Sequence, residues 1–271
     1  MVTLSFNQGQ FLETALRSVI EQDYPDLDYI VVDPGSTDGS REIIERYRSA
    51  LSHVVFEPDD GPADGLNRGF SLADGAIFGF LNADDFLKPG ALKSVAKAFE
   101  RFGDADVIAA HGWLVDEAGI DIRRKYSNSF NAWRYLYQGA YLLQQSTFFR
   151  EHAYKAVQGF NAQNRTCWDG ELWLDMALAG HRFQILDEFW SAFRVYEGSI
   201  TGSVAGGGSH QQRYKEDRAR MFQEAMGRPP AGLPYQAQRL AALLLKWGSN
   251  PVALKDRFLS LFDARSRRAP I

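Results

Sequence analysis

The chain has 271 residues, of which 45% are hydrophobic and 24% are charged. That length allows one large α/β domain with a short appendage, and that composition excludes global disorder. The formal net charge is −4, which argues against a nucleic-acid-binding protein, because neutralising phosphates requires a concentrated Lys/Arg surface.

A single cysteine, Cys167, excludes an intramolecular disulfide and a multi-cysteine zinc site. No apolar run approaches the roughly 18–20 residues that span a bilayer, and the first residues lack the pattern of a secretory signal. With one cysteine fitting a reducing compartment, we expect a cytoplasmic protein. The apolar run Leu240–Leu245, followed by Trp247, leaves open a peripheral contact with the inner face of the membrane through the C-terminal helices.

The first half of the chain alternates short apolar runs with helical patterns. Strands are predicted at residues 2–6, 29–32, 54–56 and 76–81, and helices at 11–20, 43–47, 63–72 and 89–102. Residues 29–32 are apolar throughout, which is typical of a strand buried on both faces. This order predicts an α/β fold with a Rossmann-like, mostly parallel sheet and helices on both faces.

The second half is less regular. It predicts a strand at 107–110, a hairpin at 113–115 and 120–123, a helix at 172–178, and strands at 183–186 and 189–195. A glycine-rich stretch precedes a polar helix at 211–226, and two prolines precede a helical piece at 240–262. We therefore divide the chain into a main domain, residues 1–205, and a flexible loop with a helical C-terminal extension, residues 206–271.

Acidic residues follow three of the predicted strands: Asp33, then Asp59 and Asp60, then Asp84 and Asp85. Ligands of parallel α/β sheets bind outside the carboxyl ends of the strands, so these carboxylates are expected at one edge. Their mutual repulsion requires a cation, and Mn²⁺ or Mg²⁺ bound by Asp84 and Asp85 could hold a diphosphate there. From spacing alone, a simple turn explains these two residues equally well.

Two common phosphate-binding loops are absent from the sequence. Residues 32–39 contain glycines without the G-x-G-x-x-G spacing, and no G-x-x-x-x-G-K-[ST] motif occurs. At the end of a buried strand, Asp33 is better suited to accept hydrogen bonds from a base or ribose, unless it is an ordinary turn residue.

Six segments, in register from residue 2 to residue 174, resemble those of a family 2 glycosyltransferase of the GT-A type. They are Ser5–Gln8, Tyr29–Asp33 with Ser36–Ser40, Glu57–Gly61 with Asp64, Asn67 and Gly69, Leu81–Asp85 with Pro89-Gly90, Gln145–Arg150, and Trp168–Leu174. The resemblance implies inverting transfer of a sugar from a nucleotide diphosphate donor, by family frequency a UDP-sugar. It further implies a sugar or lipid-linked acceptor, in polysaccharide or glycolipid assembly.

The same resemblance implies a role for each matching residue. Asp84 and Asp85 would hold Mn²⁺ or Mg²⁺, with Asp84 also near the donor ribose. Asp169 would be the base that activates the acceptor hydroxyl, with Glu171 as a second candidate; without the resemblance, a helix cap explains Asp169 equally well. The other implied donor contacts are Ser5, Asn7, Asp33, Ser36, Asp60, Asp64 and Asn67.

Some positions depart from the family pattern. Asn82 stands where many relatives carry an acid, and Tyr196 stands where many carry a histidine. Two other functions stay open: a non-catalytic nucleotide-sugar-binding protein, and a sugar-nucleotide pyrophosphorylase. The second would carry a basic, glycine-rich signature near its N-terminus, whereas residues 5–11 contain no lysine or arginine.

Overall fold

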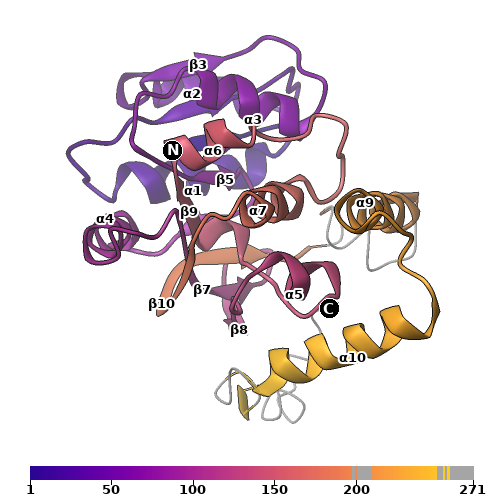
Figure 1. Ribbon diagram of the computed structural model, residues 1–271. Coiled ribbons are helices and arrows are strands. Elements are labelled where there is room, and N and C mark those ends of the chain that lie inside the picture. The colour runs from indigo at the N-terminus through magenta and orange to yellow at the C-terminus, as the bar shows by residue number, and fades with distance from the viewer. Residues whose placement is uncertain (197–198, 200–208, 249–252, 254, 257–271) are drawn as a thin grey trace.

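The computed structural model describes residues 1–196, 199, 209–248, 253, 255 and 256. The strands are β1 Val2–Leu4, β2 Ile30–Val32, β3 His53–Val55, β4 Ile77–Phe78, β5 Phe80–Asn82, β6 Phe86–Leu87, β7 Val107–Val115, β8 Asp121–Lys125, β9 Thr147–Arg150 and β10 Phe183–Arg194. The α-helices are α1 Gly9–Ile20, α2 Ser40–Arg46, α3 Pro62–Ser71, α4 Ala91–Arg101, α5 Ala132–Leu136, α6 Glu151–Ala156, α7 Trp168–Leu178, α9 Ser209–Met226 and α10 Gly232–Gly248 (Figure 1). Two 3₁₀ turns are η1 Arg48–Ala50 and η2 Gln144–Ser146.

The first sheet is parallel throughout, in the order β3-β2-β1-β5. Val2 of the central strand β1 pairs with Ile30 on one side and Phe80 on the other. The predicted α/β architecture with a parallel sheet is confirmed for the first half of the chain.

Helices cover both faces of this sheet, and its strand β2 is apolar and buried at every position. Ile30 and Val32 pack in one core cluster with Leu66 of α3, while Val31 packs on the other face with Leu16 of α1. Successive strand residues point to opposite faces, so an uninterrupted apolar strand needs a helix on each side. Each of these fully buried side chains contributes about 1.5–3 kcal/mol.

The second sheet is mixed, in the order β4-β9-β7-β10-β6, with β8 beside β7. Strands β7 and β10 pair in parallel, whereas β9 and β8 are antiparallel to β7. The strands predicted at 107–110 and 113–115 are one strand, and those at 183–186 and 189–195 are another. Gly112 lies inside β7, where a Cβ atom would lie 2.3 Å from Leu143, although the sequence predicts no strand at residues 111–112.

The strand predicted at residues 76–81 is split between the two sheets. Ile77 and Phe78 form β4, which pairs with β9, whereas residues 80–82 form β5, which pairs with β1. Gly79 makes the transition, and a Cβ atom at this position would lie 2.5 Å from the ring of Phe148. A residue without a side chain therefore fits at position 79, where the chain passes from one sheet to the other.

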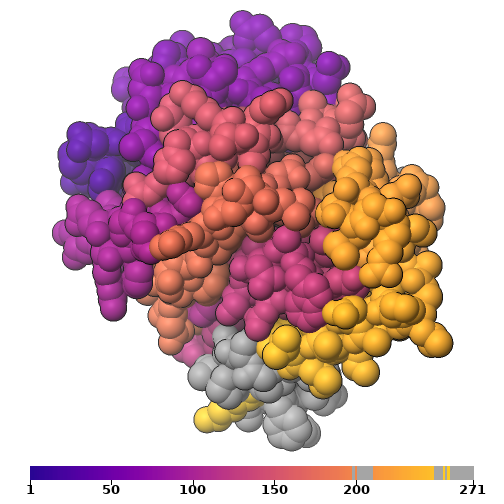
Figure 2. Space-filling model, in the orientation of Figure 1, coloured from indigo at the N-terminus to yellow at the C-terminus, as the bar shows by residue number. Residues whose placement is uncertain are grey.

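The C-terminal helices pack against the second half of the molecule (Figures 1 and 2). Met221 and Phe222 of α9, and Tyr235 and Ala242 of α10, are buried in the core cluster that contains α7. Helix α10 begins at Gly232, eight residues before the predicted start. The predicted division at residue 205, most of the glycine-rich stretch and the end of the predicted 240–262 helix lie outside the described residues. In the described part of the chain, no helix is long and apolar enough to cross a membrane.

Candidate active site

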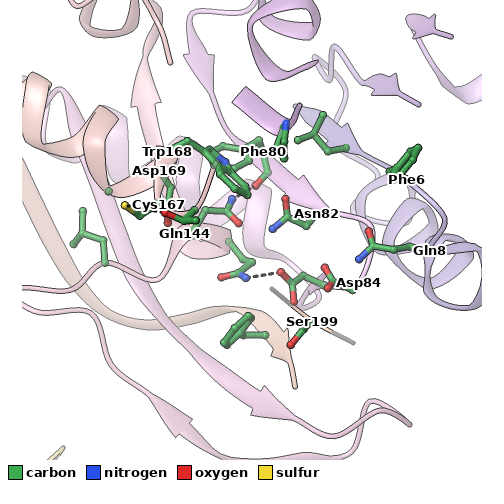
Figure 3. A pocket seen from close by; sticks show the side chains of 18 of the residues that line it. Phe6, Gln8, Phe80, Asn82, Asp84, Gln144, Cys167, Trp168, Asp169 and Ser199 are labelled. Atoms are coloured by element: carbon green, nitrogen blue, oxygen red, sulfur yellow. Dashed lines mark hydrogen bonds between the residues drawn. The ribbon is translucent and has the colours of Figure 1, made fainter. Parts of the chain in front are cut away.

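A cavity of about 1150 Å³ opens at the carboxyl ends of β1 and β5. One wall is the loop after β1, which carries Phe6 and Gln8, and the opposite wall is the start of α7 (Figure 3). Asn82 and Asp84 lie between these walls. Pockets for one small molecule are typically about 300–1,000 Å³, so this cavity has room for more than one small ligand.

Asp84 and Asp85 are on the turn between β5 and β6, but they differ in exposure. The carboxylate of Asp84 is partly exposed in the cavity and accepts a hydrogen bond from the Tyr196 hydroxyl at 3.0 Å. Asp85 is buried, and it accepts hydrogen bonds from the Arg194 backbone N–H at 2.9 Å and from the Gln145 amide. Asp84 is therefore better placed to touch a ligand.

Arg194 fixes the position of this turn from the end of β10. Its Nε donates to the Asp84 carbonyl at 2.8 Å, and its guanidinium lies 4.5 Å from the centre of the Phe11 ring. Its contribution was not apparent from the sequence, because it comes 110 residues after Asp84.

The two neighbouring carboxyls have raised pKa values. Burial raises the pKa of Asp84; burial and the adjacent Asp84 charge together raise the pKa of Asp85 well above its ordinary value. Carboxylates that destabilise each other in this way are stabilised by a cation. Together with the Asn82 side chain, which also lines the cavity, they form an oxygen donor set that fits Mn²⁺ or Mg²⁺.

Asp169 lies in the first turn of α7 and lines the same cavity. Burial raises the pKa of its carboxyl above the ordinary value, against the effect of hydrogen bonds from the backbone N–H groups of Gly170 and Asp169 itself. Figure 3 shows its side chain beside Gln144, in a row that continues through Asn82 to Asp84. A carboxylate at a helix N-terminus is stabilised by the helix dipole and can accept a proton here.

Glu171, the second candidate base, does not line the cavity. It is buried and forms an ion pair with Arg220 of α9, with Oε1 and Oε2 each 2.7 Å from a guanidinium nitrogen. Asn161 and Asn164 donate to the same two oxygens. Although burial alone would raise the pKa of Glu171, these contacts lower it. The carboxylate thus connects α7 to α9.

Asp33 and Ser36 form a polar cluster beneath the loop after β1. Asp33 is fully buried and accepts hydrogen bonds from Ser5 Oγ at 2.9 Å, Ser36 Oγ at 2.6 Å and the Ser36 backbone N–H at 2.8 Å. Arg41 Nε lies 3.3 Å from it. Of this cluster, Ser5 lines the cavity, whereas Asp33 and Ser36 do not.

Asn7 connects this cluster to the cavity. Its backbone is in the left-handed region, with φ 52°. Its N–H donates to Ser36 Oγ at 2.8 Å, and its side-chain oxygen accepts from the Thr37 N–H at 2.9 Å. Ser5 and Asn7, two of the residues expected to contact the donor, both line the cavity.

Three predicted donor-side residues lie outside the cavity. Asp60 is exposed, and its N–H donates to Asp64, which also pairs with Arg68 at 2.8 Å. Asn67 is held by the segment before α7: its amide donates to the Phe160 carbonyl at 2.8 Å, and its oxygen accepts from the Phe160 N–H and from Tyr154. Asp64 therefore connects α3 to the loop before it, and Asn67 connects α3 to the segment before α7.

Asp59 lines the cavity, although only its neighbours were named as donor contacts. Its carboxylate accepts the Gly61 N–H at 2.9 Å, and burial raises its pKa. Gly61 has φ 105°, and a Cβ atom there would lie 1.7 Å from Arg165 Nη1. Glycine is therefore required at this position, and the Arg165 guanidinium lies against the cavity wall.

Four cavity-lining side chains carry a buried polar atom without a hydrogen-bond partner among the described residues. They are Gln144 Oε1, Gln145 Oε1, Trp168 Nε1 and Trp173 Nε1. An unsatisfied buried polar group costs about 1–3 kcal/mol. Two acceptors and two donors in one cavity thus indicate a ligand with groups that both donate and accept, such as sugar hydroxyls.

The comparisons with known families and sequences all indicate glycosyltransferases. The family model described as glycosyl transferase family 2 matches residues 1–158. An uncharacterized glycosyltransferase of Nostoc sp. is 27% identical over 149 residues, covering 49% of this chain and 46% of that protein. The chondroitin synthase of Pasteurella multocida is 24% identical over 179 residues, covering 65% of this chain and 18% of that protein. The chain spans less than half the length of these relatives.

Solved structures share the fold. S. aureus TarS 1–349, solved in complex with UDP-GlcNAc, superposes with a TM-score of 0.68 at 20% identity, covering 96% of this chain and 74% of that one. A mannosyltransferase of Pyrobaculum calidifontis, solved with GDP-Man and Mn²⁺, has a TM-score of 0.63 at 16% identity, covering 98% and 81%. The predicted GT-A type of α/β fold is thereby confirmed.

Proposed function

Since the chain belongs to glycosyl transferase family 2, we propose that this glycosyltransferase moves a sugar from a nucleotide diphosphate donor, a UDP-sugar, to an acceptor hydroxyl with inversion. The observation that carries the proposal is the position of Asp169 and Asp84 on one cavity, one at the start of α7 and the other at the end of β5. That arrangement supports a mechanism in which a proton acceptor and a cation ligand act in the same space.

Asp169 is the general base of this proposal. Its carboxylate faces the cavity and is held by backbone N–H groups, which leaves it able to take the proton of the attacking hydroxyl. The acceptor oxygen then attacks the anomeric carbon while the nucleoside diphosphate leaves from the opposite face. We assign this role to Asp169 rather than to Glu171, because the Glu171 carboxylate pairs with Arg220 and does not line the cavity.

Asp84 and Asp85 are the proposed ligands of Mn²⁺ or Mg²⁺, and Asp84 is the more exposed of the two. A divalent cation there would neutralise the diphosphate of the leaving group. Ser5 and Asn7 would contact the nucleoside, while Asp33 and Ser36 hold their loop in place. Asp60, Asp64 and Asn67 position the donor-side helix α3 rather than contact the donor.

The acceptor side is the part of the cavity near α7. The unpartnered atoms of Gln144, Gln145, Trp168 and Trp173 are suited to the hydroxyl groups of a sugar acceptor or of the sugar head of a lipid-linked acceptor. The Trp168 ring, next to Asp169, can also pack against a sugar face. Polysaccharide or glycolipid assembly is the setting that such an acceptor implies.

We also propose that α10 contacts an anionic lipid surface at the inner face of the cytoplasmic membrane. Four leucines of this helix are exposed, by 85% at Leu233, 60% at Leu240, 64% at Leu244 and 48% at Leu245. The spacing of 233, 240 and 244 places three of them on one face. Residues 225–255 contain four basic residues and no acidic one. The positive charge of this segment favours contact with an anionic bilayer.

The experiment for the transfer reaction uses nucleotide binding and turnover separately. Thermal shifts with UDP, GDP, ADP, CDP and TDP, each with and without Mn²⁺, should show metal-dependent stabilisation by one nucleotide. Asp84→Asn should lose that stabilisation, whereas Asp26→Asn, an exposed carboxylate far from the cavity, should keep it. Asp169→Asn should bind the nucleotide normally and lose about 10²–10⁴-fold in turnover.

The same data distinguish the rival functions. A non-catalytic binding protein would bind nucleotide and Mn²⁺ without consuming any UDP-sugar, with either water or a sugar as acceptor. A pyrophosphorylase would instead form UDP-sugar from UTP and a sugar phosphate. Turnover unchanged in Asp169→Asn would overturn the assignment of the base.

Sedimentation with phosphatidylglycerol and phosphatidylcholine vesicles tests the lipid contact. The protein should bind the anionic vesicles, and Leu240→Ser with Leu244→Ser should weaken binding. The control Leu178→Ser changes an exposed leucine on α7 instead and should bind like the wild type. Equal binding to both vesicle types, or none, would contradict the contact.

A further inference from the structure

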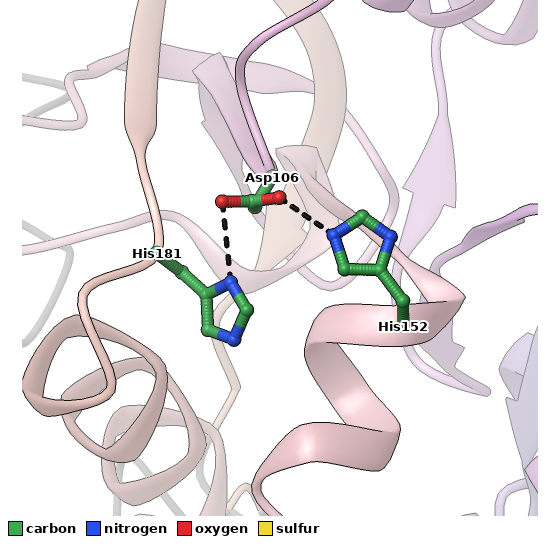
Figure 4. A group of neighbouring side chains, drawn as sticks. All are labelled: Asp106, His152 and His181. Carbon is green, nitrogen blue, oxygen red and sulfur yellow. Dashed lines mark hydrogen bonds and ion pairs between the residues drawn. The ribbon is translucent and has the colours of Figure 1, made fainter.

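Three side chains that the proposed transfer reaction does not use meet where β7 of the second sheet begins. Asp106 lies just before β7, His152 is on α6 and His181 follows α7 (Figure 4). Leu114, at the other end of β7, lines the transfer cavity. At about 3.3 Å per strand residue, Asp106 lies about 26 Å from Leu114, and none of the three residues of the cluster lines the cavity, so they form a separate site.

The ligand atoms of this cluster converge. Oδ1 of Asp106 is 2.8 Å from His152 Nε2, and Oδ2 is 3.2 Å from His181 Nδ1. All three candidate ligand atoms lie within 4.8 Å of one another. The Arg182 backbone N–H also donates to Asp106 Oδ2 at 3.0 Å, which fixes the carboxylate.

We propose that Asp106, His152 and His181 bind one transition-metal cation of the Zn²⁺ type. Two imidazole nitrogens and one carboxylate oxygen are a set of three protein ligands that zinc accepts, with water in the fourth position. Tetrahedral ligand atoms about 2.1 Å from zinc lie about 3.4 Å apart. His152, whose side chain is 63% exposed, can rotate to reach that spacing and leaves room for the water.

The chemistry of this cluster differs from that of the transfer cavity. Imidazole nitrogen favours zinc, nickel or copper, whereas the carboxylate pair Asp84 and Asp85 favours Mg²⁺ or Mn²⁺.

Bound metal would connect three elements of the core. Asp106 begins the central strand β7, and the two histidines belong to the segments around α6 and α7, which also support the cavity wall that carries Asp169. The expected consequence is a more stable fold, because an ion that binds only the native state stabilises it by mass action.

The test uses untagged full-length protein treated with EDTA and then dialysed. Calorimetric titration with Zn²⁺ should show one site, and one equivalent should raise Tm. His152→Ala and His181→Ala should each weaken binding by more than about 10-fold. His53→Ala, which removes an exposed histidine outside the cluster, should bind as tightly as the wild type.

An Asp84→Asn variant separates this site from the transfer site, since it should lose nucleotide and Mn²⁺ binding but keep the zinc titration unchanged. The proposal is overturned if wild-type protein shows no zinc binding. It is also overturned if zinc binding is unchanged in both His152→Ala and His181→Ala, since the three residues would then form only a hydrogen-bonded triad.

Discussion

Asp169 and Glu171 are two residues apart in the first turn of α7, yet their carboxylates have opposite surroundings. Asp169 faces the cavity with backbone N–H groups as its donors, and burial raises its pKa. Glu171 faces α9, where Arg220 and two asparagines lower its pKa. In the proposed mechanism, the Asp169 carboxylate serves proton transfer, whereas the Glu171 carboxylate connects α7 to α9 and stabilises the fold.

The raised pKa of Asp169 predicts the acid limb of the pH profile. A general base acts in its deprotonated form, so activity should fall as pH decreases through the pKa of Asp169. Since burial places that pKa above the ordinary 3.8, the limb of kcat/KM should lie above pH 3.8, measured at saturating Mn²⁺. Asp169→Glu should move the limb, and an unmoved limb would assign it to another group.

The Glu171–Arg220 pair predicts a pH-dependent contribution to stability. Glu171→Gln should lower the free energy of unfolding by about 1–3 kcal/mol, less than the ~3–5 of a fully buried pair, because the Arg220 side chain is 32% exposed. The pKa of Glu171 is lowered in the fold, so this contribution is complete above about pH 4.5 and is lost as pH falls through the folded pKa.

Urea unfolding of the wild type and Glu171→Gln between pH 3 and 7 checks this. The two curves should converge at the acid end. The matched control is Glu224→Gln, which removes the exposed partner of the same arginine and should cost less than about 1 kcal/mol. Equal losses for the two variants would mean that the pair is as weak as a surface ion pair.

Hydrophobic spacing located the strand ends where the cavity opens, but not which polar residues line it. Ser5, Asn7 and Asp169, which only the family resemblance indicated, line the cavity with Asp84, whereas Asp33, Ser36, Asp60, Asp64 and Asn67 do not. The partners of Glu171 could not be found in this way, because Arg220 is 49 residues away in sequence. Polar residues that bind distant segments and those that bind ligands look alike until the chain is folded.

At the scale of elements, glycines decide where strands begin and end. The sequence located the strands of the first sheet well, since their apolar runs are uninterrupted. It failed at Gly79 and Gly112 for opposite reasons: the first separates a run that looked continuous, and the second lies within a strand that looked broken. In both cases a neighbouring side chain, Phe148 or Leu143, requires the absence of Cβ.

Gly79→Ala should therefore destabilise the fold. The added methyl would lie 2.5 Å from the Phe148 ring and 3.0 Å from Met1 Sδ, and such overpacking costs about 1–3 kcal/mol. Gly103→Ala is the control, because nothing lies within 4 Å of its Cβ position. Chemical denaturation at neutral pH measures both, and a Gly79→Ala protein as stable as Gly103→Ala would show that β4 and β5 adapt freely.

At the scale of the whole molecule, the C-terminal helices complete the same hydrophobic core as helix α7. Met221 and Phe222 are buried with residues of α5 and α7, Thr166 donates to Asp217 at 2.6 Å, and Tyr214 lines the cavity. The sequence showed where these helices lie, but not that they belong to the transferase core, because α9 is polar on most of its surface.

A chain ending at residue 205, the predicted domain boundary, should not fold stably. It would lose the burial of Met221, Phe222, Tyr235 and Ala242. Large apolar side chains contribute about 1.5–3 kcal/mol each, against a net domain stability of about 5–15 kcal/mol. Near-ultraviolet circular dichroism and urea titration should show weak, poorly cooperative unfolding.

The control is a chain ending at Asp256, which keeps the Asp256 contacts with Tyr126 and Arg124. It should unfold like the full chain. Equal midpoints for all three chains would instead make residues 206–271 a separable extension.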